Sequence, residues 1–214
     1  MLKGNIGEWS EIYVLLKLLG EGKLFAADEN LNRIENQFFP ITKILREEEK
    51  GKIKEYFPNK ESNVEIYVDG IKQKRFPMNI FNIQSKLLFE DIQNHKKAKG
   101  PFSVDKAEKF MSEIECFKVK ASSTDKADIK IEIVDVHTGY SPIVGFSIKS
   151  KLGSSPTLLN AGRTTNFIYK VSCDKMEIFE ETNEIYNSKG HTDVRGRIKH
   201  LRIILSWWTV LWII

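Results

Sequence analysis

The chain has 214 residues, of which 41% are hydrophobic and 29% are charged, and its formal net charge is +4. These values are typical of a soluble globular protein with one domain, or one and a fraction, and they exclude a low-complexity chain. The weak basic excess permits nucleic-acid binding without arguing for it. Cys116 and Cys173 have neither metal-ligand nor redox-motif spacing, which predicts reduced thiols in a cytoplasmic protein.

The first predicted element is a helix over residues 6–19. Asn5 followed by Glu8 has the capping-box spacing, and apolar residues then recur at helical intervals. The chain enters this helix without an apolar region and small-residue cleavage site, so no secretory signal is expected. A second, highly charged helix is predicted over residues 41–57, with the glutamates 47–49 on a solvated stretch.

The middle of the chain predicts a hairpin and two helices. Asp69-Gly70 is a strong hairpin turn between two β-rich runs, and Ser103 is placed to cap a helix. In chain order, the predicted elements are strands over 64–68 and 71–76, and helices over 79–93 and 104–114.

A second predicted hairpin, with strands over 129–136 and 143–151, carries the candidate catalytic residues. Alternation places Asp128 on the polar face of the first strand, and Ser147 and Lys149 on the polar face of the second. A metal-dependent phosphodiesterase needs a carboxylate to hold a divalent cation and a lysine to position or activate the attacking water. The hairpin therefore indicates a phosphodiesterase site.

The register of this hairpin stays open. A symmetric loop centred on Tyr140 would set Asp128 opposite Leu152, so an asymmetric loop or a bulge is needed to bring Asp128 nearer Lys149. Lys151 therefore remains an alternative catalytic lysine. The competing interpretation is structural, because the exposed face of any half-buried hairpin shows alternating charges.

Mg²⁺ is bound by oxygen ligands, usually one or two carboxylates together with waters and phosphate oxygens. With serine at position 147, a site built on Asp128 lacks one carboxylate. Glu8 and Glu11 lie at i and i+3 on one face of the first helix and are the candidates. Glu8 has an alternative role as a capping residue, so Glu11 is the preferred ligand, and Glu132 is a reserve.

The polar segment 153–167 follows the hairpin directly. Side chains of Ser, Thr and Asn bind phosphates and sugars, and Arg and Asn bind base edges. The structural alternative is an ordinary loop followed by a capped helical turn. The candidate DNA-binding residues of this segment are Ser154, Ser155, Thr157, Asn160, Arg163, Thr165 and Asn166.

The stretches KADIKIEI and GFSIKSKLGSSPTLLNAGRTTNF, with NIGEWSEIYVLLKLL near the start, resemble the HpaII-type type II restriction endonucleases. The resemblance implies an α/β (α+β) fold of the PD-(D/E)xK type, with a mixed central β-sheet flanked by helices. It implies Mg²⁺-dependent hydrolysis of double-stranded DNA at a short palindrome, CCGG. A palindromic target implies a homodimer. A cognate modification methyltransferase is expected in the same restriction system.

By this resemblance, Asp128 is the metal carboxylate, Lys149 is the motif lysine, and Glu11 or Glu8 is the helix glutamate. Ser147 occupies the position of the second acid, which is a departure from the usual pattern.

The second departure from the family is length. The resemblance predicts a nuclease domain over residues 1–200, incomplete at its C-terminus, and an apolar non-family tail over 201–214 that resembles an out-of-frame reading. A truncated remnant that binds DNA without cutting it is the alternative function. Attachment to a membrane through Trp207, Trp208 and Trp212 is disfavoured, because the tail is too short to span a bilayer and lacks a polar face.

Overall fold

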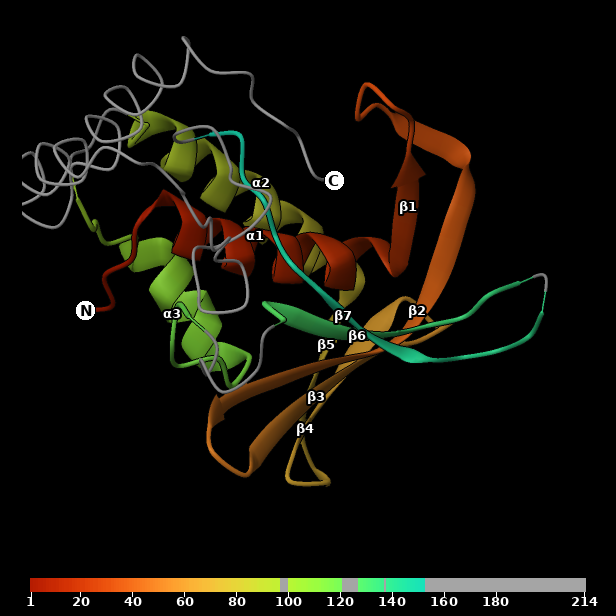
Figure 1. Ribbon diagram of the computed structural model, residues 1–214. Helices are drawn as coiled ribbons and strands as arrows, with labels where there is room; N and C mark the ends of the chain where they lie inside the picture. Colours follow the sequence, from red (N-terminus) through yellow and green to blue (C-terminus); the bar gives the residue numbers. More distant parts are fainter. Residues whose placement is uncertain (97–99, 121–126, 137, 153–214) are drawn as a thin grey trace, which may run out of the picture. The chain divides into compact units, whose positions relative to one another are not determined.

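The computed structural model describes residues 1–96, 100–120, 127–136 and 138–152 (Figure 1). These residues form an α+β domain whose elements follow one another in this order: α1 (Ile6–Glu21), β1 (Lys23–Ala27), β2 (Arg33–Glu49), β3 (Lys52–Pro58), β4 (Asn63–Val68), β5 (Ile71–Pro77), α2 (Met78–Asn94), α3 (Asp105–Glu113), β6 (Ile129–Ile133) and β7 (Ile143–Phe146).

One sheet contains all the described strands. Its order is β5-β4-β3-β2-β6-β7, and β1 pairs with the first half of β2 outside that path. Every pairing between described strands is antiparallel. The prediction of an α+β domain with a central sheet flanked by helices is confirmed. The strand β2 is central because it pairs with β1, β3 and β6, and β6 carries one of the candidate acids.

The helix α1 forms as predicted and extends two residues further. Asn5 Oδ1 accepts a hydrogen bond from Glu8 N at 3.0 Å, and Glu8 Oε2 accepts one from Asn5 N at 2.9 Å, which completes the capping box. Gly22 ends the helix in the left-handed region with φ of 64°, where a side chain would be strained. Its apolar face is buried in the main core through Trp9, Ile12, Leu15, Leu16 and Leu19.

The helices α1 and α2 lie side by side (Figure 1). Gly20 permits this approach, because a Cβ at that position would lie 2.4 Å from Asn82 Oδ1. Asn82 Nδ2 in turn donates a hydrogen bond to Gly20 O at 2.8 Å. Further along, the rings of Tyr13 and Phe89 are 5.2 Å apart. This packing holds α1, which carries Glu8 and Glu11, in a fixed position on the sheet.

The helix predicted over residues 41–57 is wrong, since this stretch forms the second half of β2 and most of β3. The glutamates are not all solvated either, because Glu48 is only 5% exposed. Ile44, Arg46 and Glu48 alternate on one face of β2 and are all buried. Glu48 forms ion pairs with Arg46 and with Lys54 of β3. The long-range pairing of β2 with β6 overrides the helical propensity of the charged residues.

The remaining predicted elements of the middle region agree with the structure, with one exception. The β4–β5 hairpin turns at Asp69 and Gly70, both at positive φ, and α2 and α3 lie where helices were expected. The predicted cap at Ser103 is wrong, because the N-cap of α3 is Val104, which makes no side-chain capping bond. Cys116 is a buried free thiol as predicted, whereas Cys173 lies outside the described residues.

Within the part of the chain that the structure describes, no helix is long and apolar enough to cross a membrane. The apolar tail 201–214, with its three tryptophans, lies outside that part.

Candidate active site

The register of the β6–β7 hairpin sets the position of Asp128. Ile129 pairs with Phe146, and Glu132 pairs with Ile143. One step further along this register, Asp128 lies next to Ser147, so the register centred on Tyr140, which placed Asp128 opposite Leu152, is wrong. The pairing of β6 with β7 reaches this register without a bulge. The Asp128 N–H donates a hydrogen bond to Phe146 O at 3.0 Å, which supports the observed register.

The chain leaves the sheet directly after β7, earlier than the strand predicted over 143–151. The Ile148 N–H is bound there by a side chain instead of a backbone carbonyl of β6, because Asp128 Oδ2 accepts its hydrogen bond at 2.7 Å. Ser150 is then tied to α1, since the hydroxyls of Ser10 and Ser150 lie 3.0 Å apart and Ser10 is buried. The segment that contains Ser147 and Lys149 is thus held between Asp128 on one side and α1 on the other.

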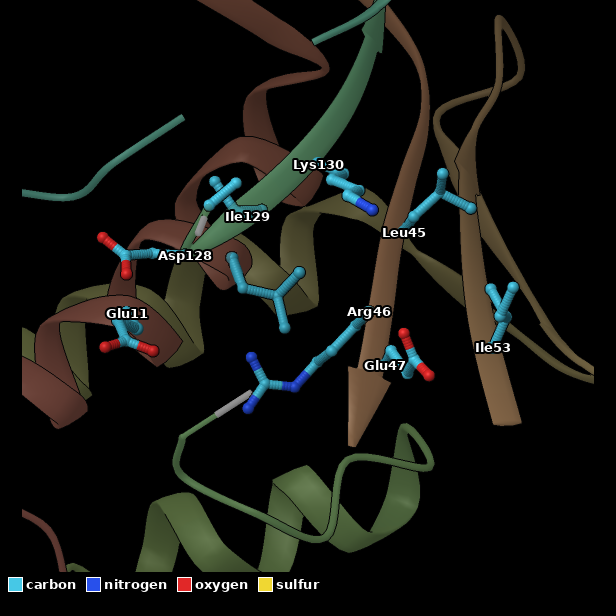
Figure 2. Close-up of a pocket in the computed structure, with 10 residues that line it drawn as sticks. Glu11, Leu45, Arg46, Glu47, Ile53, Asp128, Ile129 and Lys130 are labelled. Atoms are coloured by element: carbon cyan, nitrogen blue, oxygen red, sulfur yellow. The ribbon is translucent and has the colours of Figure 1, made fainter. Parts of the chain in front are cut away.

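Glu11 follows Ser10 on α1, and it lines the same cavity of about 70 Å³ as Asp128 (Figure 2). Figure 2 shows Glu11 and Asp128 close together at one end of this cavity, from two elements far apart in the sequence. The cavity is lined by Glu11, Leu15, Leu45, Arg46, Glu47, Ile53, Ala127, Asp128, Ile129 and Lys130. The structure therefore brings together the two carboxylates preferred as metal ligands.

The electrostatics of Glu11 agree with this proximity. The pKa of Glu11 is raised to about 7, chiefly by burial and next by the negative charge of Asp128, while the positive charges of Arg46 and Lys120 act in the opposite direction. Two neighbouring carboxyl groups, one of them poorly solvated, repel each other when both are ionised. A divalent cation between them would relieve that repulsion, so the residues present fit a Mg²⁺ ion.

The other two candidate glutamates have different partners. Glu8 forms the capping box with Asn5, as its structural interpretation predicts, and it does not line the cavity. Glu132 accepts a hydrogen bond from Thr42 Oγ1 at 3.0 Å and lies 3.6 Å from Lys43 Nζ. Among the described residues, no group of three His, Cys, Asp or Glu side chains forms a complete metal site.

Lys149 and Lys151 are both exposed, and neither lines the cavity. Lys149 directly follows Ile148, whose N–H binds the Asp128 carboxylate, whereas Lys151 is two residues further along the chain. Lys149 is therefore adjacent in sequence to the residue that binds Asp128. Ser147 is also exposed and lies beside Asp128 in the register.

Arg46 and Lys130 line the cavity, and they were not among the candidates from the sequence. The Arg46 side chain is 5% exposed, and its Nε lies 3.0 Å from Glu48 Oε1. Lys130 lies on the polar face of β6, two residues after Asp128. Because alternate residues of a strand share a face, the sequence could have predicted that Lys130 lies near Asp128. No comparable signal identified Arg46, because residues 41–57 were predicted to be a helix.

The seven candidate DNA-binding residues of the polar segment 153–167 lie outside the described residues, as does that whole segment.

Replacing Glu11 with glutamine is expected to stabilise the metal-free protein at high pH. The folded-state pKa of Glu11, about 7, exceeds its ordinary value of 4.5, so the folded protein loses stability as pH rises between these values. Glu11→Gln removes that loss. In chelator, its free energy of unfolding should match wild type near pH 4 and exceed it by about 1 to 2 kcal/mol at pH 8, a figure reduced for partial exposure.

Denaturant unfolding at several pH values measures this difference, and Glu90→Gln on the exposed surface of α2 is the control. A gain for Glu11→Gln that does not depend on pH would contradict the assigned electrostatic cause.

The family model described as HpaII restriction endonuclease matches residues 5–210, which includes the first ten residues of the apolar tail. The type II restriction enzyme HpaII of Haemophilus parainfluenzae is 37% identical over 186 residues, which is 87% of this chain. The chain spans about half the length of that relative, since the alignment covers 51% of it. No solved structure shows a significant match.

Proposed function

Because this chain belongs to the HpaII restriction endonuclease family, we propose that it is a type II site-specific deoxyribonuclease that hydrolyses double-stranded DNA. The observation that carries the proposal is the meeting of Glu11 and Asp128 in one cavity, beside the segment that contains Lys149. The proposed nuclease domain covers residues 1–200, of which the described part contains the sheet, α1 and this cavity. The proposed compartment is the cytoplasm.

The proposed cofactor is Mg²⁺, held by Glu11 and Asp128. When bound, the ion would polarise the phosphodiester and lower the pKa of a water molecule. The chain supplies two carboxylates for it, and Ser147, which lies next to Asp128 in the strand register, occupies the position of the second acid of the family pattern. Waters and DNA phosphate oxygens complete the octahedral set that Mg²⁺ prefers. Glu8 is the weaker alternative to Glu11, because its carboxylate caps α1.

The proposed role of Lys149 is to orient the attacking water or accept its proton. Asp128 holds the Ile148 N–H, and Ser10 holds Ser150, so the residue between them has a backbone fixed on both sides. Lys151 follows Ser150, outside the stretch between these two contacts, and is the alternative lysine. Lys149→Ala is therefore expected to reduce cleavage much more than Lys151→Ala in the same assay, and the reverse order would assign the lysine to position 151.

For the target, we propose CCGG, bound by a homodimer whose two-fold symmetry matches the palindrome. The polar segment 153–167 supplies the proposed contacts to bases and phosphates, and a modification methyltransferase of the same system protects the host DNA.

The test is incubation of the purified protein with Mg²⁺ and plasmid DNA that contains several CCGG sites. Discrete fragments that disappear with a chelator support the proposal, and their ends report the target. Plasmid without CCGG, or with its CCGG cytosines methylated, is the control for specificity. Random degradation of both plasmids would contradict site-specific cleavage.

A DNA-binding protein without nuclease activity is the second candidate, since no group of three potential metal-ligand side chains is found among the described residues. It would retard the CCGG duplex in a gel with a steep salt dependence and leave it uncut at every Mg²⁺ concentration.

A further inference from the structure

The segment that follows α3 has no regular structure, yet it is firmly bound to the sheet. The Phe117 N–H donates to the Glu48 carboxylate, with N–O distances of 3.0 and 3.2 Å, and Lys118 Nζ donates to Glu48 O at 2.9 Å. Arg46 Nη2 donates to Lys118 O at 2.6 Å and to Val119 O at 3.1 Å. We call residues 116–120 the anchored segment.

The anchor is a buried charge cluster of Arg46, Glu48 and Lys54, whose side chains are 5%, 3% and 8% exposed. Glu48 is paired with both cations, and the carbonyl groups of the anchored segment accept from Arg46. Hydrogen bonds between ions in a poorly solvated environment are short and strong, so they fix the backbone of the anchored segment. Val119 is also buried, in contact with Gly4 just before α1.

The anchored segment leads to the candidate active site. Arg46, which binds its carbonyl groups, also lines the cavity with Glu11 and Asp128. Figure 2 shows the Arg46 guanidinium between the segment leading from α3 and the side of the cavity where Glu11 lies. Lys120 is exposed, and its positive charge acts on the Glu11 carboxyl group. Lys120 thus continues a backbone that is bound to Arg46, and Arg46 lines the cavity together with the two acids.

Lys120 differs from the other lysine of the anchored segment and from the two lysines of β5. Lys118 is bound to Glu48 O, Lys72 is paired with Glu65, and Lys74 is paired with Glu115. No side chain among the described residues forms a hydrogen bond or an ion pair with Lys120.

We propose that Lys120 binds a backbone phosphate of duplex DNA next to the bond that is cut. This inference rests on the proposed function and adds a DNA contact to it, outside the polar segment 153–167. The chemistry is that of an ammonium group and a phosphodiester oxygen, which contributes affinity without reading the base sequence. Such a contact beside Glu11 and Asp128 holds the DNA backbone over the candidate active site.

The test is equilibrium binding of the full chain to a CCGG duplex and to a duplex of scrambled sequence, in Ca²⁺ and over a range of salt concentrations. For Lys120→Ala, Kd at about 0.1 M salt should rise about fivefold to tenfold for both duplexes, and the slope of log K against log salt should become shallower by about 0.9. Lys120→Arg should restore both values. Lys86→Ala, an exposed lysine of α2, should leave both unchanged.

An unchanged Kd and salt slope for Lys120→Ala, in a wild-type protein that cuts CCGG DNA, would overturn this contact and leave the proposed function intact. Wild-type protein that neither binds nor cuts the CCGG duplex would overturn both. A loss of affinity for the CCGG duplex alone would also overturn it, because a phosphate contact weakens binding to every sequence alike.

Discussion

Replacing Asp128 with asparagine is expected to reduce Mg²⁺-dependent cleavage of CCGG DNA by about 10³-fold or more, because a metal ion at a reacting phosphate contributes several kcal/mol. The amide retains an oxygen that accepts the Ile148 N–H hydrogen bond, so the segment that carries Lys149 keeps its place. It loses the negative charge that Mg²⁺ requires. The substitution therefore separates the metal-binding role of Asp128 from its structural role.

Single-turnover cleavage of a CCGG duplex measures this loss, and thermal unfolding shows whether the fold is kept. Asp105→Asn, an exposed change in the first turn of α3, is the matched control and should cut at the wild-type rate. If Asp128→Asn cut within about tenfold of wild type, Asp128 would not be a metal ligand, and another carboxylate would have to be sought.

Local sequence patterns predicted the parts of the site that depend on local structure. The capping box and the apolar spacing identified α1, and alternation placed Asp128 on the polar face of β6. The pairing of Glu11 with Asp128 came from counting the carboxylates that Mg²⁺ needs, and the structure brings the two together. Their role as metal ligands remains a prediction.

What the sequence patterns missed depends on long-range contacts. The β6–β7 register was misjudged because the turn was centred on Tyr140, and alternation alone does not reveal where within a long loop the chain turns. The strands β2 and β3 were mistaken for a helix because Ile41, Ile44 and Leu45 have helical spacing among strong helix formers. In the structure, β2 instead pairs with β6, some 90 residues further along the chain.

The helix wrongly predicted over residues 41–57 also concealed the position of Arg46 beside the cavity that Glu11 and Asp128 line. A glutamate run such as residues 47–49 is normally solvated, and nothing within that stretch indicates that Glu48 is buried with Arg46 and Lys54. The contact between Arg46 and the anchored segment joins residues more than 70 positions apart in the sequence. No local pattern could therefore indicate that Lys120 follows a segment bound near the cavity.

The burial of Glu48 predicts a large difference in stability between neighbouring glutamates. Glu48→Gln leaves Arg46 and Lys54 buried without their counter-ion, and breaking a buried pair in this way costs about 3 to 5 kcal/mol in the free energy of unfolding. Glu49→Gln is the matched control, because Glu49 is exposed and its pair with Lys52 is a surface ion pair that contributes little to the free energy of unfolding.

Acid should remove the stabilisation due to Glu48. Hydrogen bonds from Lys54 and the Phe117 N–H, with the charge of Arg46, outweigh the effect of burial and lower the pKa of Glu48 to about 2. Since this value lies below the ordinary 4.5, the stabilisation is complete above pH 4.5 and is lost as pH falls towards 2. Urea unfolding at pH 7 and pH 3 measures both variants against wild type. The gap between Glu48→Gln and wild type should narrow at pH 3, and equal losses for Glu48→Gln and Glu49→Gln at pH 7 would place Glu48 on a solvated surface after all.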